Sequence, residues 1–242
     1  MSLKKYFITF GGPTDNYHQT VNRICNETKA IGVFDQINGF TDLDLKNDYD
    51  FWSKHGDFIQ KNPRGYGYWL WKSYLVNKVL NTMSDNEILV YADAGCSINS
   101  NGKTRLLEYF DIVNKSKFGF LSFRLSHLIK TYTKMDTIDF FDARDLLDQY
   151  QLVGGIFILR KCEHSVRLIH AWYEFCSYYH LIDDTPSIIP NDSSFIDHRH
   201  DQSVFTLLIY KIGGEIIDDE TYFNNWNQDG IKYPIWATRK NN

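Results

Sequence analysis

Three runs of consecutive apolar residues constrain this chain most: residues 5–10, 87–93 and 153–160. Each is rich in β-branched or aromatic residues, and a segment with helical spacing follows it. A strand that is apolar on both sides needs cover on both faces, as in the centre of a parallel sheet. Strands that alternate with helices therefore predict an α/β fold, with a mainly parallel sheet flanked by helices.

The same patterns place the remaining elements. Further strands are expected at 31–39, 118–123 and 215–218, and helices at 16–30, 69–83, 103–114, 162–180 and 200–213. With 242 residues and no linker rich in Pro, Gly or Ser, the chain is expected to form a single domain over 1–242. Residues 221–242 contain Trp226 and Trp236, and are expected to pack on that domain as a C-terminal tail.

Charge and composition exclude several classes of partner. The net charge is −4 without a block of like charges, which disfavours nucleic acid and anionic membranes. No apolar run approaches the roughly 20 residues of a transmembrane helix, and the first residues lack a signal-peptide core. The four cysteines show no CxxC spacing, so we expect reduced thiols and a cytoplasmic protein.

The run at 87–93 ends in one carboxylate, Asp93, followed by the small residues Ala94 and Gly95. Ligands of open α/β sheets bind at the carboxyl ends of the strands. A carboxylate at a buried strand end is costly unless it meets a cation, a donor or water. Asp93 is therefore a candidate ligand-binding residue, and a turn aspartate bonded to nearby N–H groups is the alternative.

Cations and aromatic rings alternate in "NPRGYGYWLWKSY", residues 62–74. Such a mixture near a helix N-terminus suits a ligand with phosphate and ring parts. The alternative is that the tryptophans pack in the core and the arginine caps the surface. The candidate binding residues here are Arg64, Tyr68, Trp71 and Lys72.

Two further segments carry candidates. In "HRHDQSVF" an acid, Asp201, stands at the start of a helix, either as a first-turn acid favoured by the helix dipole or as a general base or acceptor-orienting carboxylate. Its neighbours His198, His200 and Gln202 are candidate binding residues, although a structural role is the alternative for each histidine. Gly154 and Gly155 let a substrate pass close to the backbone, or mark a bulge.

Taken in order, "RGYGYWLWKSYLV", "LVYADAGC", "VGGIFILR" and "HRHDQSVF" resemble a nucleotide-sugar glycosyltransferase of the GT-A fold. More narrowly, they resemble small glycosyltransferases found with bacterial and large-virus polysaccharide genes, over about residues 5–208. The resemblance implies a Rossmann-like single domain. It also implies that a hexosyl or related group moves from a UDP- or GDP-sugar to a hydroxyl of a glycan or glycoconjugate in polysaccharide biosynthesis.

The resemblance also assigns roles. Asp93 matches the first acid of the Asp-x-Asp motif, which binds the ribose and a divalent metal, Mn²⁺ or Mg²⁺, but the second acid is Gly95 here. A cation with one protein carboxylate must rely on phosphate oxygens and water. Without metal, Lys72, Arg64 or a histidine would neutralise the leaving diphosphate.

By the same resemblance, Phe10 and Gly11 face the base and ribose, and Gly154 and Gly155 lie beneath the transferred sugar. Asp201 faces the acceptor hydroxyl, as catalytic base in an inverting enzyme or as an orienting residue in a retaining one.

Three alternatives stay open at this stage. A non-catalytic nucleotide-sugar or carbohydrate-binding module of the same fold is favoured by the missing second acid. A metal-dependent phosphate-transfer enzyme needs clustered carboxylates, and none accompanies Asp93 in the sequence. A glycosidase needs two carboxylates, which Asp93 and Asp201 could supply.

Overall fold

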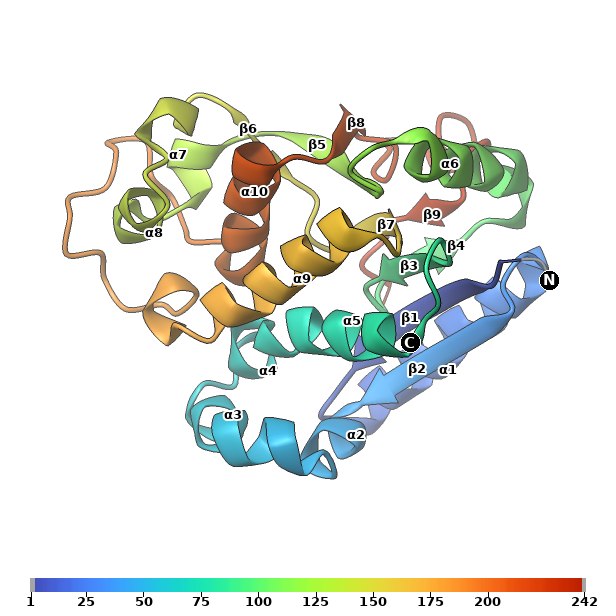
Figure 1. Ribbon diagram of the computed structural model, residues 1–242, viewed down its shortest axis with the longest axis horizontal. Helices are drawn as coiled ribbons and strands as arrows, with labels where there is room; N and C mark the ends of the chain where they lie inside the picture. Colours follow the sequence, from blue (N-terminus) through green and yellow to red (C-terminus); the bar gives the residue numbers. More distant parts are fainter. Residues whose placement is uncertain (1–2, 241–242) are drawn as a thin grey trace.

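A seven-stranded sheet forms the centre of the protein in the computed structural model, which describes residues 3–240 (Figure 1). The strands follow the spatial order β2-β1-β3-β7-β5-β6, and β8 also pairs with β5. Five of these seven, β2, β1, β3, β5 and β8, run in one direction, while β7 and β6 run against them. The mostly parallel α/β sheet is therefore confirmed. The strands are β1 (Lys5–Gly11), β2 (Gln36–Thr41), β3 (Ile88–Ala92), β5 (Phe120–Leu128), β6 (Tyr150–Leu152), β7 (Ile156–Arg160) and β8 (Glu215–Asp218).

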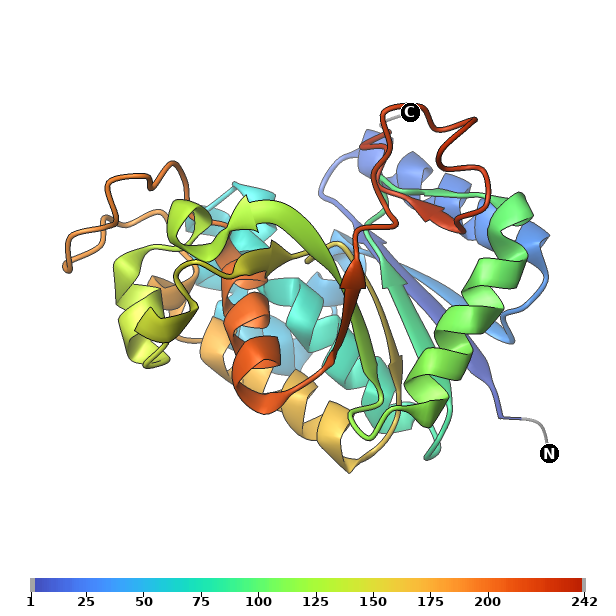
Figure 2. The same cartoon turned by 90° about the horizontal axis from the view of Figure 1, so that it is seen from above.

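Helices cover both faces of the sheet, as Figure 2 shows. Helices α1 and α6 lie on one side, and α5, α9 and α10 pack together on the other. The longer helices are α1 (Asp15–Ile31), α3 (Tyr49–Lys61), α5 (Leu70–Thr82), α6 (Lys103–Lys115), α9 (Glu163–Cys176) and α10 (His200–Ile212). The short ones are α2 (Asp42–Lys46), α4 (Gly65–Tyr68), α7 (Ile129–Tyr132) and α8 (Met135–Phe140). Within residues 3–240, none has both the length and the apolar character needed to cross a membrane.

The two faces of the sheet bury two separate cores. In β3, Leu89 and Tyr91 join the core under α5, α9 and α10, whereas Val90 and Ala92 join the core under α1 and α6. This alternation is the two-residue period of a strand. It places Asp93, directly after β3, in phase with Tyr91 and so on the side of α5 and α10.

The second strand begins later than expected. Helix α1 continues to Ile31 and ends at Gly32, which takes the left-handed conformation (φ 66°) that commonly terminates helices. The strand therefore occupies Gln36–Thr41 rather than 31–39. The expected helix over 162–180 ends at Cys176, before a short 3₁₀ turn at Tyr179–Leu181.

The segment after β8 returns across the sheet edge. Within it, β9 (Ile235–Trp236) pairs antiparallel with β4 (Ser97–Ile98), which follows β3 closely. At its start, both carboxylate oxygens of Glu220 accept hydrogen bonds from Arg105 on α6, at 2.8 Å each. Residues 219–240, called the C-terminal tail below, are thereby held against α6 and against the chain that follows β3 (Figure 2).

Candidate functional site

Asp93 stands at the carboxyl end of β3 and faces partly outward. Its side chain is 40% exposed, and its Oδ1 accepts a hydrogen bond from the Tyr91 hydroxyl at 2.6 Å. Its backbone N–H donates to the Gly155 carbonyl at 2.8 Å, which holds the strand end against the turn before β7. Asp93 therefore offers a fixed carboxylate to whatever binds at this edge.

Lys72, on the first turn of α5, lies directly behind this carboxylate. Its ammonium is 3.3 Å from Asp93 Oδ1, 3.4 Å from Asp201 Oδ2 and 3.1 Å from the Gly154 carbonyl. Burial alone lowers the pKa of Lys72, but the charges of Asp201 and then Asp93 outweigh that effect and raise it. The lysine is therefore an internal cation between two acids, and its ammonium also donates a hydrogen bond to the Gly154 carbonyl.

Asp201, on the first turn of α10, forms the inner end of the cluster. Its side chain is only 4% exposed, and burial followed by repulsion from Asp93 raises the pKa of its carboxyl to about 7, against the attraction of Lys72. Oδ2 is close enough to Lys72 for an ion pair but forms no well-directed hydrogen bond with any described residue. A carboxyl in this state changes protonation near neutral pH.

Gly154 and Gly155 form the floor between the two acids. A Cβ at Gly155 would stand 2.5 Å from Asp93 Oδ2, and one at Gly154 would stand 2.8 Å from the Gln202 Cβ. The Gln202 side chain accepts a hydrogen bond from the Gly154 N–H at 3.3 Å. Only residues without a side chain fit here, because the Asp93 and Gln202 side chains approach the backbone closely, and a substrate role of the two glycines stays a prediction.

The segment that leads into α5, which includes α4, is a left-handed turn. Residues 65–69 all have positive φ, between 53° and 83°. For Tyr66, Tyr68 and Trp69 this conformation costs about 1–2 kcal/mol each. The Gly65 carbonyl accepts a hydrogen bond from the Trp71 indole at 2.9 Å, which ties the turn to the helix that carries Lys72.

The aromatic candidates are mostly structural neighbours of this cluster. Phe10, at the end of β1, stacks on Trp71 with ring centroids 3.9 Å apart, and both are buried. Tyr68 is also buried and stacks on His200 at 5.0 Å. Gly11 is packed against α1, where a Cβ would lie 2.8 Å from the Tyr17 carbonyl oxygen.

The two histidines and Arg64 are engaged within the protein. Buried His198 accepts from the Lys134 N–H and donates to the Leu181 carbonyl, so both ring nitrogens are used. His200 donates to the Ile182 carbonyl at 2.7 Å. Burial is the main cause that lowers the pKa of both rings. Arg64 pairs with two acids of the loop before α10, Asp184 at 2.8 Å and Asp197 at 2.9 Å.

The donor set does not fit a metal ion held by the protein. Within residues 3–240, no group of three or more His, Cys, Asp or Glu side chains is arranged to hold one. The two acids of the cluster, Asp93 and Asp201, already share the Lys72 ammonium. The position of the second motif acid is Gly95, so Asp93 would be the one protein carboxylate available.

Two residues of the site were not singled out from the sequence. Tyr91 holds the Asp93 carboxylate, and its place two residues earlier on the same strand face was a usable signal. Arg23 on α1 donates to the Ala94 carbonyl at 2.8 Å, a contact across 71 residues that no local pattern reveals.

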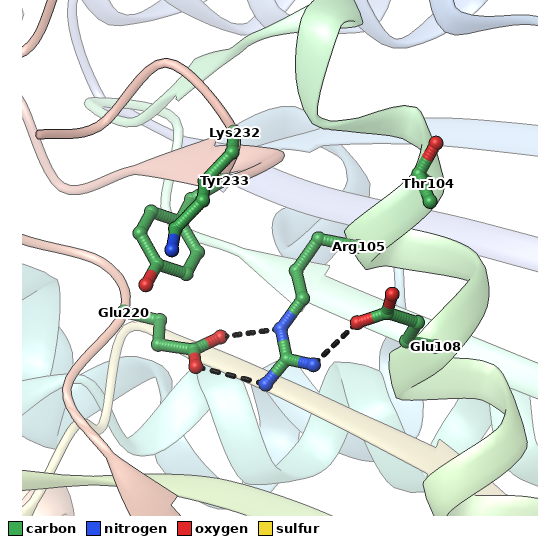
Figure 3. A pocket seen from close by; sticks show the side chains of 6 residues that line it. All are labelled: Thr104, Arg105, Glu108, Glu220, Lys232 and Tyr233. Carbon is green, nitrogen blue, oxygen red and sulfur yellow. Dashed lines mark hydrogen bonds and ion pairs between the residues drawn. The ribbon is translucent and has the colours of Figure 1, made fainter. Parts of the chain in front are cut away.

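Two cavities lie away from the cluster. One, of about 400 Å³, lies between α6 and the C-terminal tail, where the Arg105 charge is matched by Glu220 and Glu108 (Figure 3). The other, also about 400 Å³, includes Cys162 and Ile212, at the opposite end of the sheet from Asp93. Neither contains converging acids with shifted pKa values, so the Lys72 cluster is the stronger candidate site.

Two solved structures with a similar fold are glycosyltransferases. The chain is similar to a glycosyltransferase involved in the glycosylation of the major capsid of PBCV-1, with 8% identity, a TM-score of 0.54, and coverage of 96% of this chain and 91% of that one. It is also similar to mouse xyloside xylosyltransferase 1 in its apo form, with 11% identity, a TM-score of 0.52, and coverage of 96% and 97%. No family model and no curated protein matches the sequence. The chain therefore has a glycosyltransferase fold.

Proposed function

We propose that this protein transfers a sugar, hexosyl or related, from a UDP- or GDP-sugar to a hydroxyl of a glycan or glycoconjugate. The observation that carries the proposal is the cluster of Asp93, Lys72 and Asp201 over Gly154 and Gly155 at the carboxyl end of β3. The glycosyltransferase fold supports it, because open α/β sheets bind ligands at this edge.

In this proposal Asp93 binds donor hydroxyls. Its carboxylate is 40% exposed and can accept hydrogen bonds from a ligand, and Gly154 and Gly155 let the Gln202 and Asp93 side chains pack directly against the backbone of this site. Lys72 holds Asp93 by an ion pair, but its ammonium is already surrounded by protein oxygens of Asp93, Asp201 and Gly154. It therefore acts as a positioning residue rather than as a direct ligand of phosphate.

The reaction breaks the bond between the anomeric carbon and the diphosphate oxygen, and the diphosphate leaves with the electron pair. The acceptor oxygen forms the new bond to the anomeric carbon and gives its proton either to Asp201 or to an oxygen of the departing diphosphate. We propose Asp201 as the residue that controls this step, either as base or by orienting the site, because a carboxyl with a pKa of about 7 is suited to proton transfer near neutrality. Its depth behind Lys72 favours the orienting role, which suits a retaining enzyme.

The test is a nucleotide release assay with UDP- and GDP-sugars and a panel of glycan acceptors. We expect acceptor-dependent release of UDP or GDP, and a loss of about 100-fold or more in Asp93→Asn with an unchanged melting temperature. The matched control is Asp111→Asn, which changes an exposed acid on α6. Turnover by Asp93→Asn near the wild-type rate would remove Asp93 from the site.

The same experiment addresses a non-catalytic binding module. If calorimetry shows donor binding by the wild-type protein but no acceptor releases nucleotide above the hydrolysis background, the protein binds nucleotide sugars without transferring them.

A further inference from the structure

The leaving diphosphate requires positive charge, and the two cations suggested by the sequence are already neutralised. Lys72 lies between Asp93 and Asp201, and Arg64 lies between Asp184 and Asp197. Another cation near α10, Arg199, lies over the ring of Tyr132. Since the acids of residues 3–240 also do not fit a metal ion, the charge for the diphosphate has to come from a cation without an acidic partner.

The C-terminal tail reaches the position of the missing second acid. The Gly95 carbonyl accepts hydrogen bonds from the Lys240 N–H at 2.8 Å and from the Thr238 hydroxyl at 3.1 Å. A Cβ on Gly95 would lie 3.5 Å from the Cα of Arg239. A side chain at position 95 would therefore meet the tail, and the residues that meet it are basic.

These two basic side chains are exposed and uncompensated. Arg239 and Lys240 are both exposed, and no carboxylate of residues 3–240 forms an ion pair with either. The Arg23 side chain contacts both backbone segments. It donates a hydrogen bond to the Ala94 carbonyl at 2.8 Å and lies 3.5 Å from the Lys240 carbonyl.

The tail is held in register by contacts further back. The Ser97 and Thr238 hydroxyls lie 2.9 Å apart, next to the pairing of β4 with β9. Figure 3 shows the contact that holds the start of the tail, where Arg105 donates two hydrogen bonds to Glu220. Arg239 itself has a φ of 52°, an unfavourable conformation for a residue with a side chain. These contacts hold the backbone of the two basic residues against Gly95, two residues after Asp93.

We propose that Arg239 and Lys240 bind the diphosphate of the donor and of the released nucleotide, in the place that a metal held by two acids takes in Asp-x-Asp enzymes. The inference rests on the proposed function, since it assigns the phosphate ligands of the same site. It predicts that nucleoside diphosphate binding persists in EDTA and weakens as salt concentration rises.

The test is calorimetric titration of UDP and GDP in EDTA, at low and at physiological ionic strength. The variants are Arg239→Glu with Lys240→Glu, and the milder pair Arg239→Gln with Lys240→Gln. The control, Lys4→Glu with Lys61→Glu, makes the same change in net charge at two exposed lysines elsewhere. Uridine and guanosine, which lack phosphate, report the nucleoside contacts separately.

We expect the glutamate pair to weaken binding of the diphosphate by about tenfold or more, the glutamine pair by less, and the control to leave it unchanged. Nucleoside binding and melting temperature should not change. Equal affinity of wild type and glutamate pair, or wild-type binding that appears only when Mn²⁺ or Mg²⁺ is added, would overturn the tail assignment alone. Absence of UDP and GDP binding by the wild type under every condition would instead remove the proposed function, and this inference with it.

Discussion

Replacement of Lys72 by methionine tests the central claim that a buried cation holds two acids together. Methionine keeps most of the apolar volume of the side chain and removes its charge and donors. Asp93 is 40% exposed and is solvated by water once the lysine is gone, so its loss of a partner costs little. Asp201 is buried, and the loss of Lys72 raises the pKa of its carboxyl above the present value of about 7.

The magnitude depends on pH. Asp201 has a raised folded-state pKa, so the stability linked to it is present at low pH and is lost as pH rises through that pKa. In the wild type, the stability linked to Asp201 stops falling near pH 7. In Lys72→Met the pKa of Asp201 is higher, so this stability continues to fall above pH 7. The two proteins should differ near pH 6 by about 1–2 kcal/mol, the cost of leaving the buried Gly154 carbonyl without its hydrogen bond. Each further pH unit above 7 adds about 1.4 kcal/mol, which gives about 4 kcal/mol near pH 9.

Urea unfolding and thermal melts near pH 6 and pH 9 measure this difference. For a chain of this size, 4 kcal/mol corresponds to a melting shift of about 8–16 °C. The double variant Lys72→Met with Asp201→Asn is the control: its difference from wild type should not grow above pH 7, because the titrating carboxyl is gone. A Lys72→Met protein that loses the same stability at both pH values would refute the arrangement of charges argued here.

Two further changes test the site. If Asp201 is the base, Asp201→Asn should lower kcat by about 100-fold or more and leave the donor Kd unchanged. It should also abolish any rise of kcat as pH increases through 7. A change confined to the donor Kd would exclude the base role. Gly155→Ala should push Asp93 away, because the new Cβ would stand 2.5 Å from its Oδ2. It should weaken donor affinity by about tenfold and lower the melting temperature by about 2–12 °C; unchanged affinity in titrations would show that the donor does not approach this backbone.

The sequence predicted the sheet because its signal is local. Continuous apolar runs and helical spacing depend only on neighbouring residues, and β1, β3 and β7 were found where such runs occur. Asp93, Asp201 and Lys72 were also identifiable, since each stands at the end of an element that points to the same edge of the sheet. Local patterns could not show how deeply each side chain is buried. Asp93 is partly exposed, whereas Lys72 and Asp201 are both buried.

Long-range contacts explain the features of the site that the sequence patterns did not predict. Nothing near His198 in the sequence shows that its two nitrogens meet Lys134 and Leu181, so a buried structural histidine resembled a ligand. The neutralisation of Arg64 depends on a loop 120 and 133 residues further along the chain. The return of residues 219–240 to Gly95 depends on strand pairing between β4 and β9, each only two residues long, which is too short to leave a pattern.

The positions of backbone strain give independent support for the site. Tyr66, Tyr68, Trp69 and His200 all have left-handed backbone conformations, at a combined cost of about 4–8 kcal/mol. That is comparable to the whole net stability of a typical domain, about 5–15 kcal/mol. Strain of this size persists only where surrounding contacts fix it, and it concentrates at functional sites. His200 directly precedes Asp201, the other three lie within six residues before Lys72, and His200 stacks on both Tyr68 and Trp69. Four of the seven non-glycine residues with positive φ among residues 3–240 therefore lie in the two segments that lead to the lysine and the buried acid.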